Sequence, residues 1–364
     1  MQAARHEPLS GGLPPTHLLY VGSHSILEYD EVRLFDSLGF DVFSIGSYTD
    51  PANPSDDKRP AITGMTYHAD LANLCQRQRE RHTGEDMRFY IDPAKSDLHA
   101  DLIDWADMIM FAAFPEAWIV PQWPKLRGKR VIWRTIGQSD ASIEQYLTPF
   151  HPQGLEIVRY SPKEKAAFES IGVFAGEDAM IRFAKDPADW FGWVGDDPVV
   201  ANVTQDMAGR GEYCGYSFWL RATEGLPARP AGPKSDSMPG GLGALTYEAM
   251  RAYLRHARSY LYTGTQPASY TLGFIEALMT GTPVIAMAAE RFGWPAIYEA
   301  DDIALRFSPT PENAHDHLAW LLRDEGHAGS ISRQGRERAI ELFGVETIRE
   351  QWAAYLGAKV AVAA

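Results

Sequence analysis

Residues 264–286, GTQPASYTLGFIEALMTGTPVIA, place a single acid, Glu276, inside an apolar stretch with helical spacing. A carboxylate in such a position is costly unless it has a charged or hydrogen-bonding partner. The two cis hydroxyls of a ribose would be a bidentate partner. An internal arginine, a backbone N–H group or a water molecule would also satisfy the carboxylate, and the spacing alone leaves both interpretations open.

A polar loop over residues 263–269 precedes this helix and follows an apolar strand. The N-terminus of a helix offers free N–H groups and the positive end of the helix dipole, and both favour an anion. We therefore expect an anionic ligand to bind where the loop enters the helix. The candidate binding residues are Thr265, Gln266, Ala268, Ser269, Tyr270 and Thr271.

The N-terminal half carries a candidate base in VGSHSILEYDE, directly after its first apolar run. His24 in this loop could accept a proton from a hydroxyl of a ligand or bind a phosphate group. Alternatively, Ser23 or Ser25 caps the following helix and His24 is only a polar loop residue.

A second polar segment, WRTIGQSD, follows another expected strand in the same half. Arg134 and Gln138 are candidates to face a ligand there, and Arg134 is a candidate catalytic residue. The alternative for Arg134 is an ordinary ion pair.

Strands and helices alternate in both halves of the chain, and this alternation predicts an α/β fold with parallel sheets in two Rossmann-like domains. Ligands of such sheets bind beyond the carboxyl ends of the strands. The expected strands include residues 16–22, 40–46, 129–137, 156–162, 199–205, 226–232, 258–264 and 282–287. The expected helices include residues 25–39, 161–172, 211–225, 246–257 and the chain from 311 to about 355.

The chain length of 364 residues also favours two domains. A segment rich in Pro, Gly and Asp over residues 185–198 is the expected hinge. The polar, proline-rich residues 48–88 receive no element. The expected units are a disordered tail (1–16), an N-terminal domain (17–190), a C-terminal domain (197–345), and a final helix with a tail (346–364).

Composition is that of a globular protein, with 45% hydrophobic and 23% charged residues. No stretch approaches the roughly 18 apolar residues that a membrane span needs, and the N-terminus has no apolar segment of a signal peptide. Two cysteines without a CxxC pattern fit a reducing cytoplasm. The net charge of −14 argues against binding bulk nucleic acid.

Motifs of several other chemistries do not occur. The sequence has no GxxxxGK[ST], no GxGxxG after the first expected strand, no HExxH and no GxSxG. The acidic GDDP at residues 195–198 is a turn sequence in the expected hinge, so no metal site is expected there.

The stretch FIEALMTGTPVIA resembles the nucleotide-sugar site of GT-B glycosyltransferases, particularly the retaining family-4 type. That pattern is a Glu, seven residues, a second Glu, a small-residue turn with Gly-x-Pro and an apolar strand. Glu276 matches the second Glu, which in the family holds the donor ribose, and Gly281 and Pro283 match the turn. Residues 159–172, 247–264 and 331–356 are similar to other elements of that fold.

The resemblance implies a UDP- or GDP-sugar as co-substrate, retention of anomeric configuration, and no bound metal or other cofactor. It implies that the C-terminal domain binds the nucleotide, that the N-terminal domain binds the acceptor, and that the last helix crosses back to the N-terminal domain. The acceptor hydroxyl could belong to a small molecule, a glycan, a lipid, a protein or a modified base of DNA. Neither the acceptor nor the oligomeric state follows from the residues.

The sequence departs from the family pattern at two points. Ala268 stands where the first Glu is expected, and Ser269, Tyr270 and Thr271 replace Gly-Phe-Gly. Arg210 could be the diphosphate-binding Arg, but Cys214 or Gly215 stands at the expected Lys, for which Lys234 or Arg229 could substitute. These departures leave three possibilities: another sugar donor, a rearranged site, or lost catalysis. The rival functions are a catalytically silent nucleotide-sugar- or glycan-binding protein, a glycosyltransferase acting on hydroxymethylated bases of DNA, and a GT-B epimerase or phosphorylase.

Overall fold

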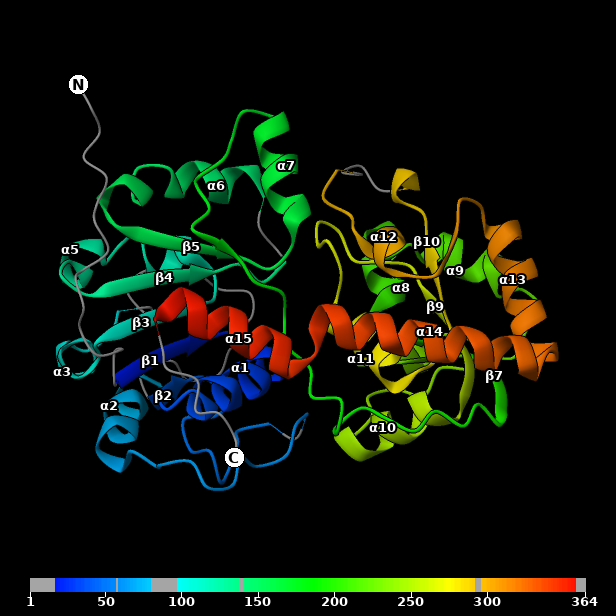
Figure 1. The fold of residues 1–364 in the computed structure, drawn as a ribbon, viewed down its shortest axis with the longest axis horizontal. Helices are drawn as coiled ribbons and strands as arrows, with labels where there is room; N and C mark the ends of the chain where they lie inside the picture. Colours follow the sequence, from blue (N-terminus) through cyan, green and yellow to red (C-terminus); the bar gives the residue numbers. More distant parts are fainter. Residues whose placement is uncertain (1–16, 57, 80–96, 138–139, 292–295, 358–364) are drawn as a thin grey trace.

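Two sheets of parallel strands lie side by side along the long axis of the molecule (Figure 1). The computed structural model describes residues 17–56, 58–79, 97–137, 140–291 and 296–357. The described strands confirm the predicted α/β fold with two Rossmann-like domains. The expected N-terminal tail lies outside the described residues.

The N-terminal sheet has the strand order β2-β1-β3-β4-β5-β6. Side chains of adjacent strand residues alternate between its two faces, as strand geometry requires. Leu18 and Tyr20 of β1 pack on α1, whereas Leu19 and Val21 pack on the opposite face with α3 and α6. The strands are β1 (His17–Gly22), β2 (Asp41–Ile45), β3 (Met108–Ala112), β4 (Arg130–Arg134), β5 (Leu155–Arg159) and β6 (Ala179–Met180).

Helices before and between these strands include the two predicted at residues 25–39 and 161–172. Ser161 caps the second of these by accepting from the N–H of Lys163, and Gly172 follows its end with φ of +74°. The helices are α1 (Ser25–Ser37), α2 (Ala69–Arg79), α3 (Ala100–Trp105), α4 (Pro115–Trp118), α5 (Trp123–Leu126), α6 (Ala141–Leu147) and α7 (Pro162–Ser170).

The C-terminal sheet has the strand order β11-β10-β9-β7-β8. Its strands are β7 (Asp197–Val203), β8 (Ala228–Ala231), β9 (Ala257–Tyr262), β10 (Val284–Met287) and β11 (Arg306–Ser308). Its helices are α8 (Met207–Arg210), α9 (Tyr216–Ala222), α10 (Tyr247–His256), α11 (Leu272–Thr280), α12 (Ala300–Ile303), α13 (Pro311–Arg323) and α14 (Glu325–Phe343). The short strands β6 and β11 were not predicted, because two- and three-residue strands carry no recognisable period.

The two chain crossings between the domains lie next to each other. Lys185 forms an isolated parallel bridge with Gly344, in which the N–H of Lys185 donates to Phe343 O (2.8 Å) and the N–H of Val345 donates to Lys185 O (3.0 Å). The segment from 185 to 196 has no helix or strand, as expected for a hinge.

The last helix, α15 (Val345–Leu356), crosses back to the N-terminal domain, as the resemblance implied (Figure 1). Trp352 is fully buried and meets the ring of Phe35 in α1 edge-on, with ring centroids 5.0 Å apart. The Tyr355 hydroxyl donates to Glu156 of β5.

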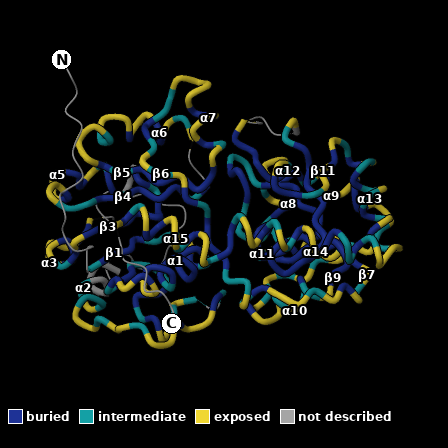
Figure 2. The backbone as a smooth tube through the Cα atoms, viewed as in Figure 1, coloured by how far each residue is buried: buried dark blue, intermediate teal, exposed yellow. Residues whose placement is uncertain are grey.

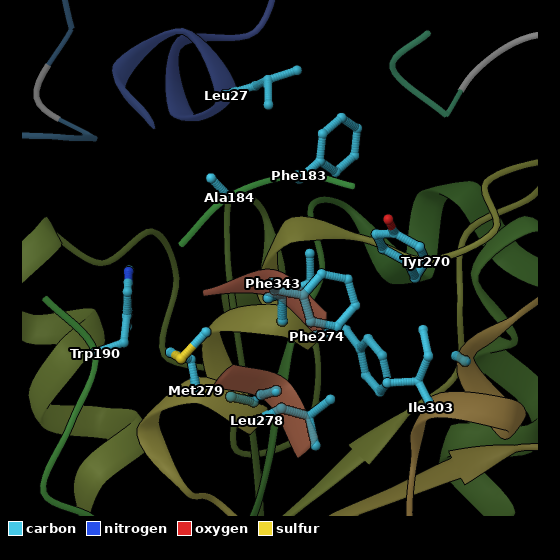
Figure 3. Packing of buried hydrophobic residues seen from close by; sticks show 14 of the residues in the cluster. Leu27, Phe183, Ala184, Trp190, Tyr270, Phe274, Leu278, Met279, Ile303 and Phe343 are labelled. Carbon is cyan, nitrogen blue, oxygen red and sulfur yellow. The ribbon is translucent and has the colours of Figure 1, made fainter. Parts of the chain in front are cut away.

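One apolar cluster runs through both domains. It joins Leu27 of α1 to Phe183 and Ala184 before the hinge and to Met279 and Phe343 of the C-terminal domain (Figure 3). The tube in Figure 2 is accordingly buried at the domain junction as well as inside each sheet. The two domains therefore meet across a packed junction, and polar groups within it need partners from the protein.

Candidate functional site

Helix α11 brings Glu276 to the domain junction. The helix begins after the loop that leaves β9, and Gly281 ends it with φ of +93°. From Phe274 to Thr280 every residue is buried, so a helix with no polar face carries one acid in its middle. Glu276 is only 3% exposed.

Two cations from outside the C-terminal domain bind Glu276. Nη2 of Arg59 and Nζ of Lys185 both donate to Oε1, the latter over 2.7 Å. Nζ of Lys185 also donates to Asp30 Oδ2 over 2.5 Å. Burial alone would raise the pKa of Glu276, but Arg59 and Lys185 hold that pKa below its usual value. The structure therefore shows the internal-arginine alternative for Glu276.

Both of these bonds fall on the same oxygen. Among the described residues, no hydrogen bond to Oε2 of Glu276 is found. The carboxylate therefore retains acceptor capacity for a further donor.

Arg59 comes from the segment of residues 48–88, to which the sequence assigned no element. Its guanidinium carbon lies 5.3 Å from the ring centre of Trp190 and 5.2 Å from that of Tyr247. Nη1 donates to Lys58 O over 2.7 Å, whereas Nε is buried and has no hydrogen-bond partner among the described residues. Sequence reasoning missed Arg59 because nothing local in a proline-rich loop indicates a contact 217 residues away.

A cavity of about 830 Å³ opens beside Arg59, between the two domains. This volume lies in the usual range for small-molecule sites. Residues 54–56, 59 and 60 of the N-terminal domain form one wall, and the start of α10 forms the other. The lining residues are Pro54, Ser55, Asp56, Arg59, Pro60, Thr246, Tyr247 and Glu248.

The loop before α11 is held against the N-terminal domain. The N–H of Ser269 donates to the Tyr160 hydroxyl (2.7 Å), and the Tyr270 hydroxyl donates to Tyr160 O (2.6 Å). The N–H of Ala268 donates within the loop to Thr265 O (2.8 Å). The N–H groups of Ala268 and Ser269 are thus already bonded, which leaves the first turn of α11 as the better source of free N–H groups.

Ala268 is covered by the other domain. A Cβ atom placed on Gly137 would lie 3.3 Å from Cβ of Ala268 and 3.0 Å from the Tyr160 hydroxyl. The position of the family's first Glu therefore lies close to the loop after β4 in the N-terminal domain.

The remaining predicted loop residues differ in burial and in hydrogen bonding. Thr265 and Gln266 are half-buried, and the N–H of Gln266 donates to Tyr213 O over 2.8 Å. Thr271 is the N-cap residue of α11, yet its side chain makes no capping bond. Oγ of Ser269 is buried without a hydrogen-bond partner among the described residues.

The candidate diphosphate-binding cations differ in their positions. Arg210 ends α8, in the segment that leaves the carboxyl end of β7. Lys234 follows β8 at the same edge and pairs with Asp206 over 2.7 Å. Arg229 instead pairs with Asp197 over 3.0 Å, at the amino end of β7, so it points away from this edge. Lys234 fits the substitution suggested by the sequence and Arg229 does not.

His24 occupies the N-cap position of α1 but caps nothing with its side chain. Neither Ser23 nor Ser25 takes that position, so the capping alternative fails in detail. His24 is an exposed residue, but neighbouring protein atoms partly desolvate its ring. This desolvation, together with the cations Lys58, Lys185 and Arg59, lowers the pKa of His24 to about 4. At neutral pH the ring is uncharged.

Arg134 does not face a ligand site. Its side chain is fully buried, and Nε donates to Glu31 Oε1 over 2.9 Å. The two Nη atoms donate to the carbonyl oxygens of Ile181 and Arg182. All three nitrogens have partners within the N-terminal domain, which is the ordinary ion pair that the sequence left open. Gln138 lies outside the described residues.

A second buried acid, Glu299, lies just before α12 and bonds to residues of the N-terminal domain. Oε1 accepts from Arg182 over 2.5 Å, and Oε2 accepts from Arg182 (3.1 Å) and from the Ser161 hydroxyl (2.6 Å). Glu299 lies in a segment without a motif, so nothing in the sequence marks this acid as a functional residue.

The described residues contain no group of three or more His, Cys, Asp or Glu side chains arranged to hold a metal ion. Within the same residues, every helix is too short or too polar to cross a membrane. The sequence GDDP straddles the end of the hinge and the first two residues of β7.

No family model and no curated protein matches this sequence. Solved structures do match it over nearly the whole chain. Sucrose-phosphate synthase from Thermosynechococcus elongatus is 14% identical, with a TM-score of 0.64 over 93% of this chain and 98% of its own. Alr3699/HepE of Anabaena, solved with UDP-glucose, is 12% identical, with a TM-score of 0.64 over 94% and 99%.

A third match is an alpha-glucosyltransferase in complex with UDP-glucose and DNA containing an abasic site. It is 10% identical, with a TM-score of 0.59 over 94% of this chain and 99% of its own. At such identities the likeness concerns the fold. The chain has the two-domain GT-B fold of glycosyltransferases.

Proposed function

We propose that this protein is a glycosyltransferase that moves a sugar from a nucleoside-diphosphate sugar to an acceptor hydroxyl. The observation that carries the proposal is the position of Glu276 within a GT-B fold. It lies on the helix that follows β9, at the domain junction and close to a nucleoside-sized cavity. Retention of configuration and a reaction without bound metal are parts of the proposal that rest on the family resemblance.

The donor nucleotide would bind to the C-terminal domain. Oε2 of Glu276 has acceptor capacity for a ribose hydroxyl, and the cavity beside Arg59 and Tyr247 is large enough for a base. The free N–H groups of the first turn of α11 would face the diphosphate, because a helix N-terminus favours an anion. Arg210 and Lys234, after β7 and β8, would add positive charge at the same edge of the sheet.

The N-terminal domain would supply the acceptor side. His24 is uncharged at neutral pH, so it can accept a hydrogen bond or a proton from an acceptor hydroxyl. Because the ring of His24 is uncharged, the cations that bind the diphosphate would have to be other residues. The departing diphosphate would itself help to deprotonate the acceptor, and closure of the domains would exclude water that would otherwise hydrolyse the donor.

Thermal unfolding in the presence of UDP-, GDP-, ADP-, CMP- and dTDP-sugars tests this proposal. A ligand that binds only the folded protein adds about 2.7 kcal/mol of stability at a hundredfold excess over its Kd. We expect one donor to raise the Tm of the wild type and to raise the Tm of Glu276→Gln much less. Glu299→Gln, which removes a similar charge elsewhere at the junction, should respond like the wild type.

The absence of a shift for every donor would contradict the proposal. The contacts around Ala268 favour a second candidate, a catalytically silent protein that binds a nucleotide sugar or a glycan. Ala268 supplies no acid at the position where the family contacts the transferred sugar. This candidate predicts a thermal shift without release of nucleotide from the donor when acceptors are added.

Transfer to hydroxymethylated bases of DNA is a third candidate. It is favoured by the structural likeness to the alpha-glucosyltransferase solved with DNA. The net charge of −14 opposes it, since most of the affinity for DNA comes from neutralised phosphates. Sugar incorporation into hydroxymethylcytosine-containing DNA, compared with unmodified DNA, separates this candidate from the others.

A further inference from the structure

We propose that Arg59 is a built-in competitor of the donor nucleotide: its guanidinium occupies Glu276 in the ligand-free protein and leaves when the ribose binds. The inference rests on the proposed function, because it supposes that a nucleotide uses this carboxylate. The inference gives Arg59 of the N-terminal domain a role in the response of the protein to bound nucleotide.

The first observation is a conflict at the carboxylate. A ribose diol binds a carboxylate best through both of its hydroxyls, but Oε1 of Glu276 already accepts from Arg59 and Lys185. Of the two cations, Lys185 is the less able to move. It is fully buried, is also bonded to Asp30, and belongs to the backbone bridge with Gly344. Arg59 is therefore the partner that a ribose would replace.

The second observation is the place of Arg59 in the cavity wall. Arg59 lines the 830 Å³ cavity and bonds Glu276, whereas Glu276 itself does not line the cavity. A ligand that enters through the cavity meets Arg59 before it meets the carboxylate.

The third observation is incomplete bonding of the guanidinium. Nη2 and Nη1 have acceptors, but the buried Nε has none among the described residues. Trp190 and Tyr247 hold the guanidinium by cation–π contacts, which lack the directional strength of a second carboxylate bond. Arg182, by comparison, contributes both of its terminal nitrogens to Glu299.

The consequence is coupling between the nucleotide and the segment that carries Arg59. Arg59 lies in the segment of residues 58–63. Ile62 in the same segment is held to the N-terminal domain, because its N–H donates to Pro51 O over 2.8 Å. When the guanidinium leaves Glu276, this segment loses its anchor in the C-terminal domain. The conformation of the N-terminal wall of the cavity can then change while the donor is bound.

Titration of UDP and of GDP into three proteins tests the proposal: the wild type, Arg59→Gln and Arg182→Gln. The apparent Kd of a site equals its intrinsic Kd divided by the fraction of molecules in which the site is free. If Arg59 occupies Glu276 in nine of ten molecules, Arg59→Gln should bind about tenfold more tightly than the wild type. Arg182→Gln removes an arginine–carboxylate pair of the same junction and should leave affinity within about twofold.

Hydrogen exchange on the wild type gives a second test that needs no variant. Saturating UDP or GDP should speed amide exchange in residues 58–63 while it slows exchange in the first turn of α11. Weaker binding by Arg59→Gln, together with slower exchange in 58–63, would overturn the proposal, because Arg59 would then contact the nucleotide directly. Equal affinity of wild type and Arg59→Gln would also overturn it.

The two proposals fail in distinguishable ways. If neither wild type nor Arg59→Gln binds any nucleotide, the proposed function fails and the competitor with it. If the wild type binds but Arg59→Gln shows no gain, only the competitor is excluded. Binding by Arg59→Gln alone would support both.

Discussion

Glu276 and Glu299 are both acids of the C-terminal domain, each 3% exposed, and both meet cations across the domain junction. Glu299 uses both oxygens, with two bonds from Arg182 and one from Ser161. Among the described residues, Glu276 uses one oxygen, and one of its two bonds comes from Arg59, whose Nε has no hydrogen-bond partner there.

The difference indicates how a buried acid that holds a junction together can be distinguished from one available to a ligand. Burial is alike at the two sites, and each acid bonds to at least one cation from outside the C-terminal domain. The distinguishing properties are the number of satisfied acceptor positions and the neighbourhood of a cavity. By these criteria Glu299 is structural, whereas Glu276 is the acid that we propose to bind the nucleotide, with Arg59 as its temporary partner.

The largest expected effect comes from the hinge cation on the Glu276 side. Lys185→Met removes the ammonium that two carboxylates share, leaving Asp30 buried without its partner. Loss of one member of a buried pair costs about 3–5 kcal/mol, and we expect a loss of that size in urea denaturation. Lys163→Met is the matched control, since Lys163 pairs with Asp302 at the surface of the same junction and should cost at most about 1 kcal/mol. Equal losses in the two variants would contradict the structural account of Lys185.

A third buried acid, Glu164, extends the comparison to a site without an ion pair among the described residues. It accepts from the Thr135 hydroxyl and from the N–H of Tyr160, and its Oε1 has no partner there. Burial raises the pKa of Glu164 from 4.5 to about 7, despite the opposing charge of Arg159.

The folded protein therefore keeps this proton up to about pH 7, whereas the unfolded chain releases it near pH 4.5. Stability from this group is fully present below pH 4.5 and is lost as the pH rises towards 7. The loss amounts to about 3 kcal/mol at most. Glu164→Gln should remove this part of the pH dependence, which stability curves at pH 4.5, 6 and 7.5 would measure. An unchanged slope in the variant would place the pKa of Glu164 near its usual value.

The comparison itself is tested by nucleotide binding to the two acid variants. Glu276→Gln should weaken binding of the recognised nucleotide by about tenfold, the equivalent of about 1.4 kcal/mol. Glu299→Gln should change affinity by less than about twofold, although both variants lose a buried charge. Calorimetric titration of both proteins below their Tm measures this contrast. Equal losses of affinity in the two variants would contradict the distinction between a structural acid and a nucleotide-binding acid.

The smallest effect is expected where the domains meet without either acid. Gly137 has φ of +86°, and a Cβ there would approach the Tyr160 hydroxyl and Ala268. Gly137→Ala should therefore lower the free energy of unfolding by about 1 kcal/mol through backbone strain and crowding. Gly154→Ala, at φ of +103° with open space around it, separates strain from crowding. A loss no greater in Gly137→Ala than in Gly154→Ala would show that crowding at Ala268 is negligible.

Local patterns in the sequence predicted the fold and the helix that carries Glu276. The strand, the polar loop and the apolar helix with one acid are consecutive, so their order carries the information. The cap of α7 by Ser161 was predictable for the same reason, because it involves residues within one turn.

The partners of these residues were not predictable. Arg59 and Glu276 are 217 residues apart, and Ser161 and Glu299 are 138 apart. A single sequence does not indicate which distant cation meets which acid. Arg134 shows the same limit, since a residue at the end of a strand can turn inwards to Glu31 as easily as towards a ligand.

The return of α15 to the N-terminal domain has a consequence for synthesis of the chain. Chains fold as they emerge, the first domain generally before the second. Here the slot beside Phe35 is filled by Trp352, which is made only after the whole C-terminal domain. The domain translated first is thus the last to be completed, and a nascent chain must carry that open apolar slot until its final helix leaves the ribosome.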